Sequence, residues 1–426
     1  MKRFLTYPAS RPQWAALFIF FFVARLGWIG LYRSYAVHLK HSTDTQDETY
    51  ENGVIAKNIL AGKGFYMDAM AGFPAGPTAH KPPLYPVLLA GASKLAGPYD
   101  LFVVRILQAL MMTVATVLLI GLFSRVFGPG IGLLTGLLIT MNPVLAKADT
   151  FIENTALSIF LSSCFLYYLW RTLQNDQPAP LRTGLFMGLT ALANPSFIPF
   201  YPCVAFLFMR QTFQDRWLKG VLILLVAGLT ILPWSLRNHH VFNRWVPVNS
   251  NFPFNIWMGS NPLATGSFTL RGGEPFPIPE DILQQTQGMN EADRNSYFGK
   301  IGWRYARSHP AHFFRVRLKA FFYFWMTSRP WMGYGKRIDI INVSGALLML
   351  ITACGGWILA FRQGYREGCI FFALFFLSYC SVYTLTHADS IDRYRLVIDP
   401  YVLGFSAVFL KTIFEKGKDT SEAASA

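Results

Sequence analysis

The feature that most constrains this chain is a series of long apolar runs, each of which could cross a membrane. The clearest runs are 13–32, 101–124, 219–237, 338–361 and 368–387. A helix needs about 20 apolar residues to span the hydrocarbon core of a bilayer. The composition agrees, because only 14% of the residues are charged, against roughly 25% in a soluble domain. The sequence therefore predicts an all-α polytopic membrane protein.

The formal net charge is +15, but the basic residues do not form a patch that could bind nucleic acid. They lie in short segments between the apolar runs, as in the cytoplasmic loops of membrane proteins. We therefore expect membrane lipids, and no nucleic acid, as partners. The first run is long and lacks a clear cleavage site, so we interpret it as a retained signal anchor with a cytoplasmic N-terminus. The basic residues beside the runs are Lys2, Arg3, Arg11, Arg210, Arg216, Lys219, Arg362 and Arg366.

The alternation of apolar and polar segments divides the chain into six parts. They are a cytoplasmic tail and first transmembrane helix (1–32), a first outward loop with an acidic motif (33–82), a transmembrane bundle (83–237), an outward loop with amphipathic helices (238–336), C-terminal transmembrane helices (337–414) and a polar cytoplasmic tail (415–426). Within the second outward loop, 291–307 and 313–325 have the pattern of amphipathic or interfacial helices.

The basic residues leave two alternatives for the topology. If every apolar stretch crosses once, Arg125 and the linker 171–182 lie outside, against the charge bias. If instead 83–97 only dips into the membrane and 183–209 is broken after Asn194, before a proline, both linkers return to the cytoplasm. We prefer the second alternative, which has about ten crossings.

The first outward loop contains four carboxylates within eight residues, Asp44, Asp47, Glu48 and Glu51. Apolar residues at helical spacing follow them and predict a short surface helix that ends at Gly62. A partly desolvated carboxylate there could take a proton from an acceptor hydroxyl or amine. The alternative is ordinary surface acidity, because helix N-termini favour acidic residues.

A second candidate is the segment that leads from His80 and Lys81, through two prolines, into an apolar helix that carries Tyr85. The two basic residues stand at the membrane boundary beside a helix N-terminus, which favours anions. A phosphate at headgroup level would suit this place. The alternative for Lys81 is a lysine that extends its ammonium group to the interface.

A third candidate is the segment before the last span, where Arg393 and Arg395 lie on the outward side. Guanidinium groups bind phosphate oxygens with two parallel hydrogen bonds. The alternative is local ion pairs with Asp389, Asp392 or Asp399.

Glu153 lies at the end of a span, on the outer face in the preferred topology, and acids at membrane depth are functional candidates. The adjacent His239 and His240 do not indicate a metal, because neighbouring side chains of a helix or strand point in different directions. We interpret this pair as part of a loop and predict no metal ligands.

The order of five short motifs resembles the protein O-mannosyltransferase and lipid A aminoarabinose transferase superfamily. The motifs are IAKNILAGKGF (55–65), PPLYP (82–86), NPSF (194–197), LPWSLRN (232–238) and RYRLVIDPY (393–401). The resemblance implies a GT-C type helical bundle, a polyprenyl-phosphate sugar as donor, and transfer on the outer, periplasmic or luminal, face. It also favours a multi-pass protein of a bacterial inner membrane whose site faces the periplasm.

The resemblance also implies roles for residues. An acidic residue of the first outward loop serves as general base, and the family's Asp-Glu pair best matches Asp47 and Glu48, with Asp44 and Glu51 as alternatives. The substrate-binding residues that it implies, together with those that the sequence singles out, are His80, Lys81, Tyr85, Glu153, Arg393 and Arg395. No cofactor is required, and a divalent metal is possible but not indicated, because a lipid-phosphate leaving group already carries its charge.

We therefore expect a glycosyltransferase that inverts the anomeric carbon. Its acceptor, whether protein, lipid or polysaccharide, is not encoded in any motif. One alternative is a transporter or flippase of a lipid-linked sugar, which would use the same cations without chemistry, although such carriers are marked by internal repeats that we do not find. Another is a scaffold subunit that has no activity.

Overall fold

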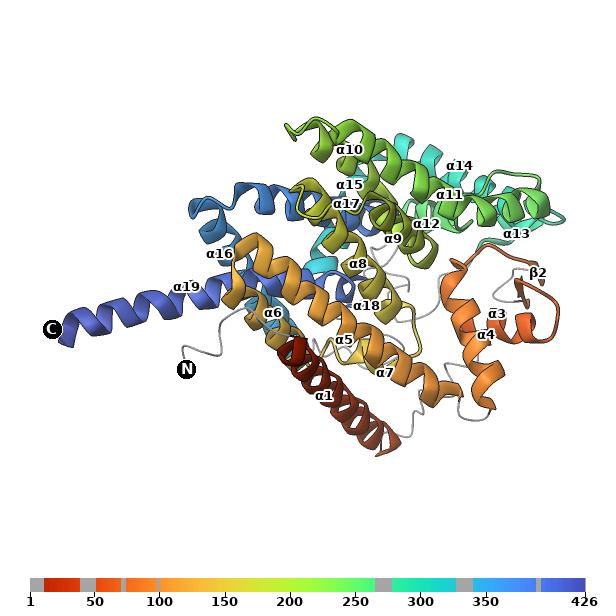
Figure 1. Cartoon of the computed structure of the whole chain (residues 1–426). Coiled ribbons are helices and arrows are strands. Elements are labelled where there is room, and N and C mark those ends of the chain that lie inside the picture. Colours follow the sequence, from red (N-terminus) through yellow and green to blue (C-terminus); the bar gives the residue numbers. More distant parts are fainter. Residues whose placement is uncertain are drawn as a thin grey trace.

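The computed structural model describes residues 11–38, 51–69, 74–97, 100–264, 278–326, 340–387 and 392–425, and it is almost entirely helical (Figure 1). The short strands β1 (Tyr66–Met67) and β2 (Gly76–Pro77) form an antiparallel pair. The helices are α1 (Arg11–His38), α3 (Glu51–Leu60), α4 (Leu84–Ala96), α5 (Asp100–Phe127), α6 (Pro129–Met141), α7 (Lys147–Thr150), α8 (Thr155–Leu173), α9 (Pro180–Ala193), η3 (Pro195–Phe200), α10 (Tyr201–Met209), α11 (Arg216–Phe242), α12 (Phe252–Gly259), α13 (Glu280–Gln285), α14 (Glu291–Ser308), α15 (Pro310–Met326), α16 (Ile340–Arg362), α17 (Arg366–Thr386), α18 (Asp392–Leu396) and α19 (Asp399–Ser425).

Six helices in the described part of the chain are long and apolar enough to cross a membrane. They lie in α1, α5, α8, α11, α16 and α17, and every apolar run singled out in the sequence is among them. Shorter apolar helices are formed by 84–96, 129–141 and 195–209. The prediction of an all-α membrane protein is confirmed, whereas the number of about ten crossings stays a prediction.

Two breaks in the helical pattern lie where the sequence predicts them. The helix α4 has 13 residues and is therefore about 20 Å long, too short for a hydrocarbon core of about 30 Å. The segment 183–209 is divided between α9, η3 and α10, and Asn194 caps the break by accepting a hydrogen bond from the Ser196 amide at 3.1 Å. The proline at position 195 provides no amide hydrogen, which favours a break at this point.

The loops that the two topologies treat differently lie at one end of the bundle. Arg125, in the last turn of α5, forms an ion pair of 3.6 Å with Asp176, in the linker after α8. Lys219, near the start of α11, donates to the side-chain oxygen of Asn175 at 2.6 Å. Both linkers therefore share a face with the basic start of α11, as the preferred topology requires.

The interpretation of His239 and His240 as a loop pair is wrong. Both residues belong to the last turn of α11, which ends only at Phe242. Asn243 then adopts a left-handed conformation with φ of 52°, which terminates the helix. The polar segment expected from residue 238 thus begins about one turn later, because neither histidine stops a helix.

The centre of the bundle is aromatic and tightly packed. Phe123 of α5 stacks on Phe372 of α17, with ring centroids 5.0 Å apart. A Cβ atom on Gly404 of α19 would lie 2.0 Å from the ring of Phe123. Close approach of helices at small residues is how transmembrane helices gain packing energy. The far part of α19 extends away from the other helices (Figure 1).

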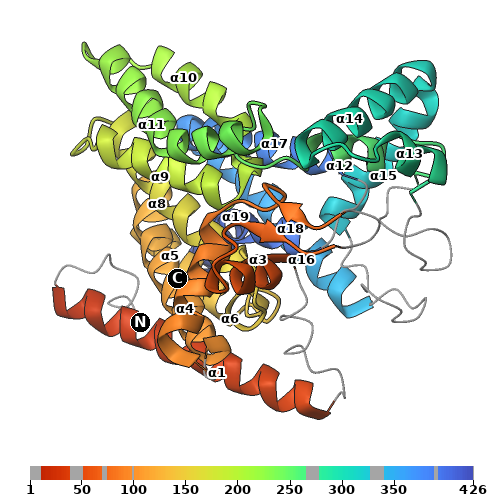
Figure 2. The same cartoon turned by 90° about the vertical axis from the view of Figure 1, so that its right-hand side faces the viewer.

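The helices α12 to α15 form a separate layer, which Figure 2 shows at the upper right, away from α1. The amphipathic stretches expected at 291–307 and 313–325 correspond to α14 and α15. The Trp257 ring of α12 packs on Phe298 of α14, with centroids 4.7 Å apart. This layer covers the end of the bundle opposite to the basic linkers, where α8 begins and where α11 and α17 end.

Candidate functional site

The first part of the site is held in place by Arg237 of the LPWSLRN motif. Its guanidinium donates to the backbone oxygen of Phe65 at 2.9 Å and to that of Thr78 at 2.7 Å. These two residues flank the strand pair, and the amide of Thr78 also donates to the Phe65 oxygen at 3.0 Å. These contacts hold the ends of the strand pair together and therefore fix the position of the chain just before His80 and Lys81.

Glu51, the first residue of α3, contacts both of these basic residues. Its Oε1 lies 3.0 Å from His80 Nε2, and its Oε2 contacts Lys81 Nζ. Burial alone would raise the pKa of Glu51, but the charges and hydrogen bonds of Lys81 and His80 outweigh burial and hold that pKa well below its ordinary value. The ion pair is therefore lost only in acid, as the pH falls through the lowered pKa. A carboxylate with so low a pKa is a weak proton acceptor at neutral pH.

A cavity of about 360 Å³ lies beside this cluster, within the range of roughly 300–1,000 Å³ that is typical of ligand pockets. Two of the residues singled out from the sequence, Lys81 and Glu153, line it. Asn194 and Ser196 of the NPSF motif and Tyr394 of the RYRLVIDPY motif line it as well. Segments far apart in sequence thus meet at one cavity among helix ends, which polar and apolar side chains line together.

One wall of the cavity is formed by the segment 247–255, which the LPWSLRN motif fixes in place. Trp234 Nε1 donates to the Val248 oxygen at 2.6 Å, and Ser235 Oγ donates to the Pro247 oxygen at 2.8 Å. The side-chain amide of Asn238 satisfies the carbonyls of 246 and 248. Backbone carbonyls outside regular helices and strands need such partners where water does not reach them, so this motif has a structural role.

Glu291 joins the outer layer to the same place. Its carboxylate accepts hydrogen bonds from Thr78 Oγ1 at 2.5 Å, from the Ala79 amide at 2.8 Å and from Ser250 Oγ at 2.5 Å. The first two donors stand just before Lys81, and the third lies within the 247–255 wall. A residue of α14 therefore couples two walls of the cavity.

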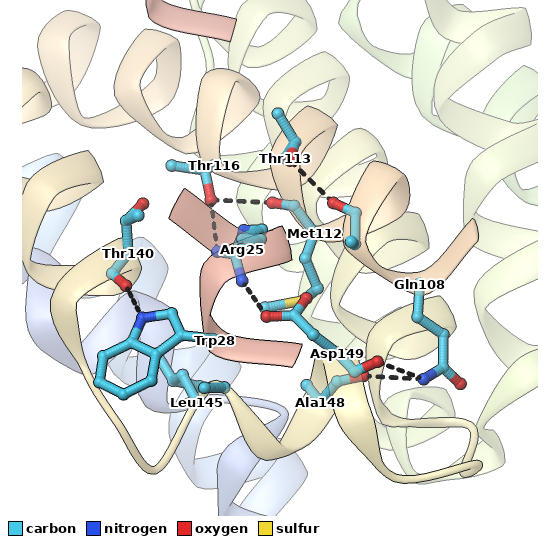
Figure 3. Close-up of polar contacts among 12 residues, drawn as sticks. Arg25, Trp28, Gln108, Met112, Thr113, Thr116, Thr140, Leu145, Ala148 and Asp149 are labelled. Atoms are coloured by element: carbon cyan, nitrogen blue, oxygen red, sulfur yellow. Dashed lines mark hydrogen bonds and ion pairs between the residues drawn. The ribbon is translucent and has the colours of Figure 1, made fainter. Parts of the chain in front are cut away.

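The segment that precedes Glu153 is fixed by Gln108 of α5 (Figure 3). Gln108 Nε2 donates to the backbone oxygens of Ala148, Asp149 and Phe151 at 3.2, 3.1 and 2.9 Å. Its Oε1 accepts a hydrogen bond of 2.7 Å from the Tyr85 hydroxyl. Tyr85 is buried and is not among the residues that line the cavity. The hydrogen bond between Tyr85 and Gln108 therefore connects the segment of Lys81 with the segment of Glu153.

A buried ion pair fastens the first span to this segment. Arg25 Nη1 of α1 lies 2.8 Å from Asp149 Oδ2, and Arg25 Nη2 donates to Thr116 Oγ1 of α5 at 3.0 Å (Figure 3). The exposed fraction of both charged side chains is 1% or less. The ion pair joins α1 to α7, and the hydrogen bond to Thr116 joins α1 to α5.

Arg395, predicted from the sequence to bind phosphate, is not among the residues that line the cavity. Arg395 is buried, and its Nε lies 3.0 Å from Asp399 Oδ1 while its Nη1 donates to the Trp325 oxygen at 2.8 Å. This is the local ion pair considered as the alternative. The carboxylates Asp44, Asp47 and Glu48 and the side chain of Arg393 lie outside the described residues.

Comparisons with known proteins agree with the motifs. Residues 80–236 match the family model "dolichyl-phosphate-mannose-protein mannosyltransferase". The resemblance to this family is confirmed. The match covers less than half of the chain, and it contains Lys81, Glu153 and Asn194. No curated protein matches the chain in sequence.

A solved structure with a similar arrangement is the archaeal oligosaccharyltransferase AglB from Archaeoglobus fulgidus, in complex with an inhibitory peptide and a dolichol-phosphate. The two share 14% sequence identity with a TM-score of 0.49, over 89% of this chain and 48% of that chain. The present chain thus spans about half the length of that protein. The apolar helices and the family match identify an integral membrane protein.

Most of the polar lining of the cavity was not predicted from the sequence. Six asparagines from four segments line it, and only Asn194 stands in one of the five motifs. A neutral amide carries no charge signal, and asparagine is common in loops. The only local sign was the density of asparagine between 249 and 255, where three of seven residues are of this type.

Proposed function

We propose that this chain is a membrane glycosyltransferase that takes a sugar from a polyprenyl-phosphate carrier and holds the head group in the cavity. The observation that supports this most is the meeting of Lys81 and Glu153 at one cavity, both from the segment that matches the mannosyltransferase family. An ammonium group at the cavity wall suits a phosphate. The acceptor, whether protein, lipid or polysaccharide, enters from the outer face.

The reaction that we propose is a single displacement. A carboxylate of the first outward loop removes the proton of the acceptor hydroxyl, whose oxygen attacks the anomeric carbon. The bond between that carbon and the phosphate oxygen breaks, and both bonding electrons leave with polyprenyl phosphate. Attack opposite the leaving group inverts the anomeric carbon. Lys81 stabilises the charge on the departing phosphate oxygen, so no metal is needed for the leaving group.

Among the loop carboxylates, we assign the base to Asp47 or Glu48, with Asp44 as the alternative. Glu51 is less suited to accept a proton, because Lys81 and His80 stabilise its ionised form. We assign to Glu51 the task of holding Lys81 in position. Arg393 remains a proposed second ligand of the phosphate.

Glu153 is proposed to contact the substrate. Arg395 is better explained by its ion pair with Asp399, and Tyr85 by its hydrogen bond with Gln108. Both residues then act on the site by fixing the backbone around it.

The test is an assay of purified protein in detergent, given a radiolabelled polyprenyl-phosphate sugar and an extract of envelope acceptors. Wild type is expected to release free polyprenyl phosphate. Asp47→Asn is expected to lower this release by about a hundredfold or more, since general bases contribute roughly 10²–10⁴, while donor binding persists. Glu48→Gln is measured in parallel.

Full activity in both variants would remove these residues as the base. Wild type that moves the labelled donor across proteoliposomes without releasing polyprenyl phosphate would instead establish the transporter alternative. Asp293→Asn is the control, because this carboxylate lies in α14 and pairs with the exposed Arg244 rather than lining the cavity.

A further inference from the structure

We propose that the exposed sides of α14 and α15 together bind anionic phospholipid headgroups, in the leaflet on the cavity side of the membrane. The inference goes beyond the proposed function and does not depend on it. Its starting point is the sequence, because residues 294–338 contain ten Lys and Arg residues and neither Asp nor Glu. A stretch with one sign of charge attracts a partner of the opposite sign. The fold determines which of these cations such a partner can reach.

The exposed side of α14 is basic. Lys300, Arg304 and Arg307 are exposed and stand four and three residues apart, so they share one side of the helix. Trp303 lies among them with 47% of its surface exposed, and tryptophan is enriched where a membrane meets water. The other side of α14 packs on α12. The basic side therefore points away from the layer to which α14 belongs.

The exposed side of α15 combines an apolar stripe with a basic edge. The stripe consists of four large apolar residues at positions i, i+4, i+7 and i+8, which are 48–69% exposed: Phe314, Leu318, Phe321 and Phe322. Arg315 and Lys319 are exposed as well, and each lies about 100° around the helix from the stripe residue before it. A helix at a membrane interface has this arrangement, with its apolar side among acyl chains and its cations among headgroups.

The contacts of α15 with α17 place it at the depth of the headgroups. The helix α17 has 21 residues and is about 32 Å long, just enough to cross the hydrocarbon core, so its last turn lies at the membrane boundary. Arg317 of α15 donates to the backbone oxygens of Thr384 and His387 at this end, at 3.4 and 3.0 Å. Phe324 of α15 stacks on Tyr383, with ring centroids 5.8 Å apart. Both α14 and α15 project to one side of the bundle (Figure 2), where lipid surrounds a membrane protein.

A membrane surface accounts for both parts of this face, whereas a soluble polyanion accounts for only one. A polyphosphate or an acidic polysaccharide would pair with the cations but leave the apolar stripe of α15 in water. A phospholipid layer offers phosphates and acyl chains side by side. A zwitterionic headgroup brings its own cation, so the surplus of positive charge favours anionic lipids, by about fivefold for each Lys or Arg near the surface.

The experiment asks which headgroups lie against the two helices. Full-length protein is placed in phosphatidylcholine nanodiscs with a small share of a photoreactive probe. The probe is either phosphatidylglycerol or phosphatidylcholine, with the same photoreactive group near the glycerol, and the labelled peptides are mapped by mass spectrometry. Peptides from 300–322 are expected to take up the phosphatidylglycerol probe about tenfold more than the phosphatidylcholine probe. Peptides from 344–358 of α16, which contain no charged residue, are the internal reference and should show no preference.

A matched pair of variants tests whether charge is responsible. Replacing Arg304, Arg307, Arg315 and Lys319 together with glutamine should bring the preference of 300–322 close to one, because each charge contributes about fivefold. The control exchanges the same four residues for the other cation (Arg304→Lys, Arg307→Lys, Arg315→Lys and Lys319→Arg) and should keep the preference. All four residues are exposed, and uptake of the phosphatidylcholine probe by α16 at the wild-type level shows that a variant is folded.

Three results would overturn the inference. The first is equal uptake of the two probes by 300–322 in wild type, and the second is a preference that the glutamine variant retains. The third is the absence of both probes from 300–322. In that case, binding of soluble polyphosphate that the glutamine variant loses would assign the face to a soluble polyanion. None of these results bears on the proposed function, which the transfer assay tests separately.

Discussion

Replacing Lys81 with alanine is expected to lower sugar transfer by about a hundredfold or more. Lys81 lines the cavity, and we propose that its ammonium group stabilises the charge on the departing phosphate. Removing one preorganised donor of this kind costs roughly 10²–10³ in rate. The expected loss falls on both donor affinity and the rate at saturating donor, measured as release of radiolabelled polyprenyl phosphate. Lys81→Arg should restore only part of the activity, because a planar guanidinium does not reproduce a compact ammonium group.

Two controls separate this role from a simple change of charge. Lys94→Ala removes an exposed lysine from α4, the helix that follows Lys81, and should leave transfer unchanged. The double variant Lys81→Ala with Glu51→Gln removes the ion pair as a whole. If this double variant regains wild-type activity, the loss in Lys81→Ala comes from the exposed charge of Glu51, and the phosphate role of Lys81 is wrong.

Replacing Arg25 with methionine is expected to destabilise the protein by about 3–5 kcal/mol, since breaking a buried ion pair leaves a charge without a partner. The Asp149 carboxyl group would remain buried after losing the Arg25 guanidinium (Figure 3). The segment that leads to Glu153 should then lose its anchor on α1. The measurement is the fraction of protein that stays monodisperse in detergent after heating.

A second variant tests whether charge or packing is responsible. Arg25→Met combined with Asp149→Leu removes both charges and should recover most of the lost stability, as apolar replacements of buried pairs often do. Arg182→Met is the control, because this exposed arginine of α9 should contribute less than about 0.5 kcal/mol. Equal destabilisation in the single and double variants would contradict the role of the ion pair and indicate lost packing.

The elements that the sequence predicts are those with a local physical signal. A run of apolar residues marks a span wherever it lies, and the proline at 195 favours a helix break because it lacks an amide hydrogen, although Pro233 is accommodated inside α11. The short helix α4 after Lys81 also has a local signal, in the prolines before it. So has the end of α3 before Gly62, because glycine readily adopts the positive φ of 76° found there. The contact of the 171–182 linker with the start of α11 agrees with the preferred topology, which rests on the charge bias of each loop.

The features that could not be predicted depend on contacts between distant segments. Nothing local indicates that Arg25 faces Asp149, or that Glu51 pairs with Lys81. Arg395 illustrates the reverse case. Its sequence context favoured both a phosphate and an ion pair, and only the fold places Asp399 beside it. The asparagine side chains that line the cavity carry no charge, so no charge pattern in the sequence predicted them.

Cross-linking of the donor most directly tests the claim that this cavity holds the sugar head group. A polyprenyl-phosphate sugar with a photoreactive group on the sugar is irradiated with the purified protein, and the labelled peptides are mapped by mass spectrometry. We predict labels in one or more of the segments 81–82, 153–155, 194–199, 247–255 and 382–387, which line the cavity, and their loss when unlabelled donor is added in excess. Labels that excess donor displaces only from segments outside the cavity, with these five unlabelled, would contradict the claim.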